Sequence, residues 1–201
     1  MTSLFPNGYL VERTIENAVS FDSLNVEPLV LNDLYGNACK NAAFLKMAHD
    51  GDCLYCVFRC YFKNKPKDMT AVNGKKVYRD ECVELFIGGK SEYFELDVSP
   101  YNVSFYAIVE NDGDPEPDFK EIENDGICIT TQIHKDFYDV LYKIPLCELA
   151  VFPKLYFNAF RVEMKNGERV SRSLFPTNST SHHVPDAFVC INLESCAQIN
   201  Y

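Results

Sequence analysis

Hydrophobic and polar residues alternate along most of the chain with a period of two, which is typical of half-buried β-strands. The pattern predicts strands at residues 26–31, 42–48, 53–62, 81–87, 92–98, 103–109, 127–133, 137–144, 155–164, 169–175 and 187–193. Turn signals such as Asp50-Gly51 and Asn166-Gly167 separate them. About ten strands joined by short turns predict an all-β, immunoglobulin-like or jelly-roll sandwich, with residues 1–201 forming one domain.

Helical periodicity is scarce. Pro145–Ala150 predicts one helical turn, because proline suits the first helical position. Ile15–Leu24 predicts a second short helix, and the poorly hydrophobic Glu110–Asp125 predicts a long loop. No internal repeat or interdomain linker interrupts the pattern, which supports the interpretation as one domain.

The charge balance narrows the range of partners. Nineteen Lys and Arg residues against 29 Asp and Glu residues give a formal net charge of −10. This balance disfavours nucleic acids and anionic membranes, which both require clustered positive charge. The N-terminus lacks the charged and apolar regions of a signal peptide. We therefore expect a cytoplasmic protein, or a secreted one if a leader has been removed, and the sequence leaves the oligomeric state open.

Nine cysteines occur, mostly within apolar, strand-like runs. Cysteine in such a context usually behaves as a small buried hydrophobic residue. Cys53 and Cys56 form a C-x-x-C pattern, but residues three apart on a strand point to opposite faces. The sequence therefore predicts structural thiols rather than a redox motif or a zinc site.

Oxygen ligands are dense in the segment that starts at Glu110. Asp112 and Asp114 are candidate calcium ligands there, although the segment lacks the glycine of an EF-hand loop. The alternative is a solvated, self-repelling loop. The sequence requires no cofactor, and calcium is the one metal that these side chains suit.

Two predicted strands combine an apolar face with a face of carboxylates and aromatic rings. Glu84 shares its face with Phe86, whereas Val83 points the other way. Glu95 shares a face with Tyr93 in the same manner. Such mid-strand carboxylates can accept hydrogen bonds from sugar hydroxyls or form cross-strand ion pairs, and the two interpretations are equally open.

Arg161 follows two small or aromatic residues on one strand face and suits either a sugar ligand or a structural salt bridge with Glu84 or Glu95. His182-His183 lies in a loop rich in Ser, Thr and Asn, and adjacent histidines are poorly placed to chelate a metal. We therefore expect this pair to be solvated or hydrogen-bonded. No nucleotide-binding or serine-nucleophile motif occurs.

Several stretches, in this order, resemble the motifs of carbohydrate-binding module family 9 domains, within the broader DOMON-like sandwiches. Residues 49–55 resemble the D-D-x-x-L-Y turn, residues 78–87 the W-x-D-D-x-V-E-V-F strand and residues 93–100 the Y-Y-E-F-E-V-N-P strand. Residues 157–161, 173–177 and 183–188 resemble N-F-Y-R, S-W-S-P-T and H-x-P-E-x-F-G. The resemblance covers roughly residues 20–195.

The resemblance implies a non-catalytic β-sandwich that binds a mono- or oligosaccharide and takes part in carbohydrate catabolism. In that family two tryptophans clamp a sugar ring, and bound calcium can be structural. This sequence has no tryptophan. The resemblance implies carbohydrate contacts from Tyr78 at the first clamp position, from Leu174 or Phe175 near the second, and from Glu84 and Arg161 as polar partners.

Two other functions remain open. The missing tryptophans favour a sandwich that has lost sugar binding and contacts other proteins. A small glycosidase would instead use carboxylates such as Glu84 and Glu95. An open cleft beside Tyr78, Glu84 and Arg161 would favour ligand binding over protein contact, and carboxylates engaged by arginine would argue against catalysis.

Overall fold

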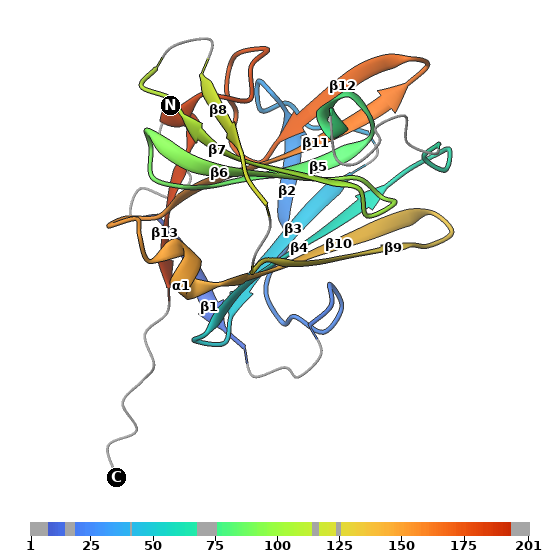
Figure 1. The fold of residues 1–201 in the computed structure, drawn as a ribbon. Coiled ribbons are helices and arrows are strands. Elements are labelled where there is room, and N and C mark those ends of the chain that lie inside the picture. The colour runs from blue at the N-terminus through green and yellow to red at the C-terminus, as the bar shows by residue number, and fades with distance from the viewer. Residues whose placement is uncertain are drawn as a thin grey trace.

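The computed structural model describes residues 8–14, 19–40, 42–67, 76–113, 117–123 and 126–193. Thirteen strands lie in these residues and form two facing layers (Figure 1). The first layer has the antiparallel order β8-β7-β6-β5-β11-β12. Its strands are β5 (Cys82–Gly88), β6 (Glu92–Val98), β7 (Ser104–Glu110), β8 (Asp118–Glu121), β11 (Tyr156–Lys165) and β12 (Glu168–Ser173).

The second layer has the order β2-β3-β4-β10-β9. Its strands are β2 (Leu29–Asp33), β3 (Ala43–His49), β4 (Cys53–Tyr61), β9 (Cys128–Ile133) and β10 (Phe137–Pro145). The layers join along one side, where β2 pairs with β12. A second link runs through β1 (Tyr9–Arg13), which lies parallel to both β3 and β13 (Val189–Leu193).

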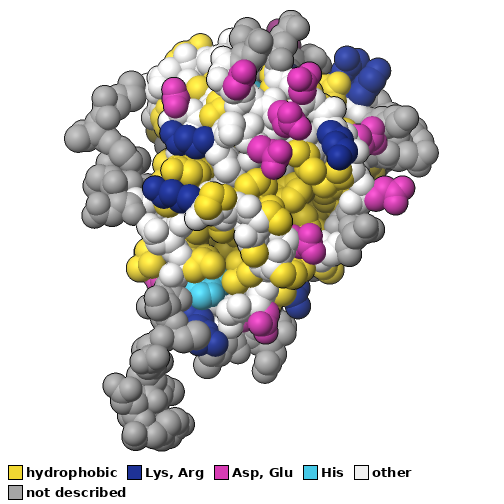
Figure 2. Space-filling model, turned by 60° about the vertical axis from the view of Figure 1, so that its left-hand side comes forward, with side chains coloured by type: hydrophobic (Ala, Val, Ile, Leu, Met, Phe, Trp, Pro, Cys, Tyr) yellow, Lys and Arg dark blue, Asp and Glu magenta, His cyan; other side chains and the backbone are white. Residues whose placement is uncertain are grey.

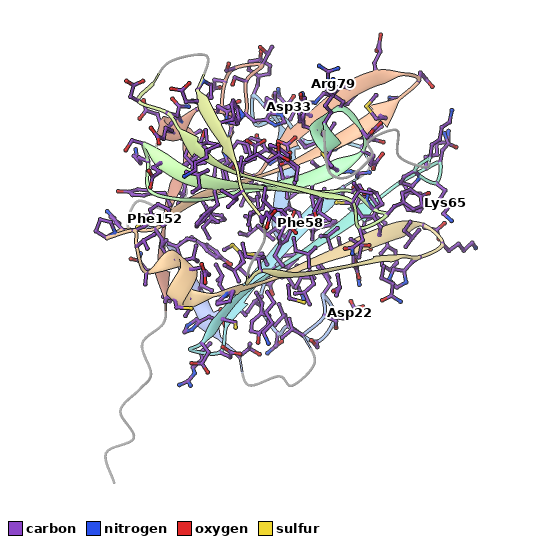
Figure 3. All side chains as sticks on the ribbon, in the orientation of Figure 1. Asp22, Asp33, Phe58, Lys65, Arg79 and Phe152 are labelled. Carbon is purple, nitrogen blue, oxygen red and sulfur yellow. The ribbon has the colours of Figure 1, made fainter. Side chains whose placement is uncertain are left out.

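The core fills the space between the layers because each layer turns its apolar face inward. Val83, Leu85 and Ile87 of β5 belong to one buried cluster with Phe58 of β4. Phe58 points from the second layer toward the first (Figure 3). Tyr142 of β10 donates from its hydroxyl to the carbonyl oxygen of Leu96, 3.0 Å away, and so satisfies a buried polar group within the core. The predicted all-β sandwich is confirmed.

Short helices complete the chain. They are η1 (Val77–Arg79), α1 (Leu146–Leu149) and η2 (Pro185–Ala187). The helical turn predicted at Pro145–Ala150 is confirmed by α1, with Pro145 directly before its first residue. The helix predicted at Ile15–Leu24 is wrong over residues 19–24, which form turns, and residues 15–18 lie outside the described residues.

Two strands escaped the sequence prediction. The segment Glu110–Asp125 was expected to be a loop, but it contains β8, whose four residues are all exposed. An exposed strand has no apolar face, and therefore shows no alternation in the sequence. β1 was also missed, because only Val11 of its five residues is buried.

The expectation for the cysteines holds only in part. Cys56, Cys60 and Cys82 are buried, and all eight described cysteines are free thiols. The other five are partly or fully exposed: Cys39, Cys53, Cys128, Cys147 and Cys190. Cys53 and Cys56 differ in burial, as expected for residues on opposite strand faces. Cys196 lies outside the described residues.

Figure 2 shows the side of the molecule on which α1 and β13 lie in Figure 1. Hydrophobic side chains gather across the middle of this face, with most charged side chains around them. A shallow hollow there is lined by Leu146, Leu149, Phe152 and Leu155, among others. No helix in the described part of the chain is long and apolar enough to cross a membrane.

Candidate ligand-binding site

The outer face of the first layer carries aligned rows of carboxylate and aromatic side chains. Residues that pair across neighbouring antiparallel strands point to the same face. One row therefore runs from Phe160 through Glu84 and Asp97 to Phe105. The next row runs from Phe86 through Glu95 and Ala107 to Glu121. The carboxylate–aromatic faces predicted from the alternating pattern are confirmed.

The short helix η1 brings Tyr78 to the rim of this face. Val77 is fully buried against Cys82 and Val162, which fixes the turn on the sheet. Backbone hydrogen bonds from Arg79 to Lys76 and from Asp80 to Val77 close it. The neighbouring Tyr78 is partly exposed and lines the pocket described below.

β8 supplies a further aromatic side chain. Its pairing with β7 places Phe119 opposite Val109 and Glu121 opposite Ala107. Phe119 is 51% exposed although it is a large apolar residue. Phe105 on β7 is partly buried on the same face. An exposed phenylalanine above a polar face offers an apolar surface to a ligand.

The loop between β12 and β13 covers one side of the same face. The His182 ring stacks on Phe160 with centroids 4.4 Å apart, and the His183 ring stacks on Phe86 at 4.9 Å. The Tyr93 hydroxyl lies 2.9 Å from Nδ1 of His183. Both histidines are thus held by ring stacking and hydrogen bonds to other residues, which agrees with the expectation that they are hydrogen-bonded.

Together these elements enclose an open pocket of about 590 Å³. Its walls include three aromatic side chains, two histidines and charged groups of both signs. The lining residues are Lys76, Tyr78, Glu84, Glu95, Phe105, Phe119, Glu121, Arg169, Thr180, Ser181, His182 and His183. Pockets that bind small molecules are of this size and usually combine apolar walls with a few fixed polar groups.

Glu84 lies at the base of the pocket as an ion-paired carboxylate. Nδ1 of His182 lies 2.5 Å from Glu84 Oε2, and Nη2 of Arg169 lies 3.3 Å from Oε1. Burial by itself raises the pKa of Glu84, but the charge and hydrogen bond of His182, with Arg169, outweigh this effect and lower the pKa overall. Glu84 is therefore ionised and already fixed in position.

Glu95 has a different environment. Burial and the charge of Glu84 raise its pKa to about 8, so Glu95 is largely protonated at neutral pH. The pKa of neighbouring Asp97 is also raised well above its usual range, by burial and by the charges of Glu95 and Glu84. Burial lowers the pKa of His183 to about 4, so this imidazole is neutral.

Arg161 does not reach the pocket, and the expectation that it acts there beside Glu84 is corrected. In the strand register Arg161 pairs with Val83, whereas Glu84 pairs with Phe160, so the two side chains point to opposite faces. Arg161 is fully buried between the layers, with Nη2 2.8 Å from Glu81 Oε1. The salt bridge expected with Glu84 or Glu95 is formed with Glu81 instead.

Leu174 and Phe175 also lie away from the pocket. Both are 7% exposed and belong to the core cluster, where Phe175 packs edge-on against Phe157. The side chain of Asn158 holds this segment, since it donates to the Phe175 carbonyl and accepts from the Phe175 amide. The second aromatic wall is therefore formed by Phe105 and Phe119, not by the residues expected from the resemblance.

The calcium ligands expected after β7 form no site in the described residues. Asp112 is exposed, and Asp114 lies outside the described residues. Nowhere in the described ranges do three His, Cys, Asp or Glu side chains meet in a group that would hold a metal ion. We derive no role for calcium from this structure.

Sequence reasoning missed Phe105, Phe119, Glu121, Arg169 and the two histidines as pocket residues. Arg169 does sit on a predicted strand, and an arginine partner for Glu84 was one of the alternatives considered. The histidines and Phe119 reach the pocket from a loop and from an exposed strand. Neither element shows a periodicity that would reveal the direction of its side chains.

Comparison with solved structures finds proteins with a similar fold. A candidate carbohydrate-binding protein from Bacteroides uniformis has a TM-score of 0.73 and 13% identity, over 92% of this chain and 98% of that one. A family 9 carbohydrate-binding module from Caldicellulosiruptor kristjanssonii in complex with cellotriose has a TM-score of 0.67 and 18% identity, over 96% of both chains. The chain has the fold of carbohydrate-binding module family 9.

A family 9 module from the same organism in complex with glucose gives a TM-score of 0.61 and 19% identity, over 96% of this chain and 99% of that one. The predicted resemblance in fold is confirmed by these structures. No protein-family model matches the sequence, and no curated protein matches it significantly. The likeness thus lies in the three-dimensional arrangement, and the family 9 fold alone assigns no ligand.

Proposed function

We propose that the protein is a non-catalytic module that binds a mono- or oligosaccharide in the pocket beside Tyr78. The observation that carries the proposal is the combination of aromatic walls and a fixed polar base in one open hollow of about 590 Å³. Sugars present apolar C–H faces and a rim of hydroxyls, so they suit aromatic walls with neighbouring hydrogen-bonding groups. The sugar complexes of two structures with the same fold support this proposal.

The polar groups of the pocket have complementary roles in this proposal. Ionised Glu84 accepts hydrogen bonds from hydroxyls, and its partners His182 and Arg169 hold it in position. Glu95, which is largely protonated near neutral pH, can donate as well as accept. A catabolic role is a further prediction that follows from the resemblance and depends on which sugar is bound.

The two alternatives are less well supported. An open hollow, rather than a flat covered surface, lies beside Tyr78 and Glu84, which favours a small ligand over a protein partner. The pocket does contain three carboxyl groups, those of Glu84, Glu95 and Glu121. Glu84, however, is engaged by both Arg169 and His182, and this ion pairing argues against a role as nucleophile or general base.

Isothermal titration calorimetry with a panel of mono- and oligosaccharides tests the proposal. We expect one sugar class to bind saturably, and we expect Tyr78→Ala and Phe119→Ala each to weaken binding by about tenfold, since one aromatic contact contributes about 0.5–1.5 kcal/mol beyond its buried area. Tyr35→Ala is the matched control, because Tyr35 is 56% exposed and lies outside the pocket. Saturable binding that both pocket variants leave unchanged would contradict this site.

A further inference from the structure

The base of the pocket holds more carboxyl groups than its positive charges neutralise. Glu84 of β5 lies directly opposite Asp97 of β6, and Glu95 lies two residues from Asp97 on the same strand face. All three side chains are buried. Among the described residues, the short contacts from positive or histidine groups, those of Arg169 and His182, both go to Glu84.

Glu95 is the carboxyl group at the base of the pocket that no positive or histidine group among the described residues reaches within hydrogen-bond distance, and its hydrogen-bonding neighbour is the Asp97 carboxyl group. It lines the pocket, its residue is 4% exposed, and Oε2 has no hydrogen-bond partner within the described residues. Nε2 of His183 lies 3.9 Å away, too far for a hydrogen bond, and this imidazole is neutral. A buried oxygen without a donor is costly, so the site favours a ligand that supplies one.

The chemistry around Glu95 favours a charged donor over a neutral one. A hydroxyl would donate to the Glu95 carboxyl group but would leave the excess of carboxyl groups uncompensated. An ammonium group would do both, and the rings of Tyr78, Phe105 and Phe119 add cation–π attraction at the walls. Because the described residues hold no group of metal-ligating side chains, a metal ion is a poorer occupant of this position.

We propose that the pocket selects sugars that carry a protonated amine, and that the Glu95 carboxylate receives this amine. The inference rests on the proposed function, because it names the class of sugar bound in the same pocket. The sugar ring lies against the aromatic walls, and the ammonium donates to the Glu95 carboxylate. Neutral sugars lose the charged contact and bind more weakly.

Binding is coupled to release of a proton. In the unliganded protein Glu95 carries a proton near neutral pH, since its pKa is about 8. The ammonium replaces that proton, which passes to the buffer, while the amine keeps its own charge. The titratable and charged groups around Glu95 among the described residues are Tyr93 and Asp97 on its own strand, Glu84 of β5, and the pocket side chains Lys76, Tyr78, Glu121, Arg169, His182 and His183.

Calorimetry with matched pairs of sugars tests the inference: glucosamine against glucose, and galactosamine against galactose, at pH 7. We expect the amino sugar of the preferred pair to bind at least about tenfold tighter, as for a hydrogen bond to a charged group. Titrations in two buffers of different ionisation enthalpy should show close to one proton released per amino sugar bound, and none for the neutral sugar. N-acetylglucosamine, which has no charge, should behave like glucose.

Two variants locate the effect. Glu95→Gln should bring the affinity ratio of amino to neutral sugar close to one and abolish proton release. Glu92→Gln is the matched control, since Glu92 is an exposed glutamate on the same strand and should keep the wild-type ratio. If Glu95→Gln fails to fold, the affinity ratio and proton release of the unaltered protein still decide the question.

The outcomes separate the inference from the proposed function. Equal affinities for amino and neutral sugars would overturn the inference and leave sugar binding intact. A preference that survives in Glu95→Gln would overturn the assignment to Glu95. If no sugar of the panel binds, the proposed function fails and the inference fails with it.

Discussion

Replacing Arg161 with methionine tests whether this residue contributes to stability through the core or to ligand binding in the pocket. The guanidinium is fully buried between the layers, where Nη2 lies 2.8 Å from Glu81 Oε1 and Nη1 donates to the carbonyl oxygen of Tyr61 at 2.7 Å. The group also lies over the Tyr138 ring at 5.7 Å. Methionine keeps much of the volume but leaves a buried carboxylate and a carbonyl oxygen without this donor.

The expected cost is large. Removing one partner of a buried ion pair lowers the free energy of unfolding by about 3–5 kcal/mol, because the other charge stays buried without compensation. Domains are commonly stable by about 5–15 kcal/mol, so Arg161→Met should remain folded at low denaturant but unfold at a clearly lower urea concentration. Glu81→Gln should also destabilise. The double variant should lose less than the sum of the two, because the pair is then removed together.

Urea unfolding followed by fluorescence or circular dichroism gives all four free energies of this cycle. Sugar titration at low urea then tests the second half of the reasoning: the folded Arg161→Met protein should bind sugar as the unaltered protein does, since Arg161 is absent from the pocket lining. A stability loss below about 1 kcal/mol would refute the energetic argument. Lost binding with unchanged stability would return Arg161 to the site.

Three further predictions concern stability. Between pH 6.5 and 8 the free energy of unfolding should fall with rising pH, because folded Glu95 keeps a proton that the unfolded chain has lost. A difference of one bound proton gives a slope of up to about 1.4 kcal/mol per pH unit. Urea unfolding at several pH values measures this slope, and Glu95→Gln should reduce it. Gly88→Ala should lower stability by about 1–3 kcal/mol in the same assay, since a Cβ there would lie 2.7 Å from Cα of Tyr93; an unchanged urea midpoint would contradict the close approach. Asn158→Ala should cost about 1–3 kcal/mol through the two lost hydrogen bonds to the Phe175 backbone, which the thermal unfolding midpoint would reveal.

The alternating pattern predicted most of the fold because most strands bury one face. β5 shows this directly, since Val83, Leu85 and Ile87 pack into the core while Glu84 points to the pocket. The pattern failed where burial is weak, as in β8. It also could not place a charged residue between the layers. Arg161 shares the inward face of its strand, and tertiary partners such as Glu81 and the Tyr61 carbonyl oxygen compensate its burial there.

The candidate site was predictable only where regular strands carry it. Glu84 was found from the alternation of its strand, whereas Tyr78 was implied by the resemblance, and both line the pocket. His182 belongs to a loop, and its place depends on stacking against Phe160 and on the hydrogen bond to Glu84. Both are tertiary contacts, and the one to Glu84 spans 98 residues of sequence, so no local pattern predicts them.

The pocket also shows how a family 9 fold without tryptophan can keep an aromatic site. The pocket has three aromatic side chains smaller than tryptophan, Tyr78 from η1, Phe105 from β7 and Phe119 from β8. Smaller rings each contribute less contact area, so more of the binding free energy must come from the polar base. If the pocket binds a sugar as proposed, the charge of Glu84 and the protonation of Glu95 select which sugar is bound, and the aromatic walls select only for the shape of a sugar ring.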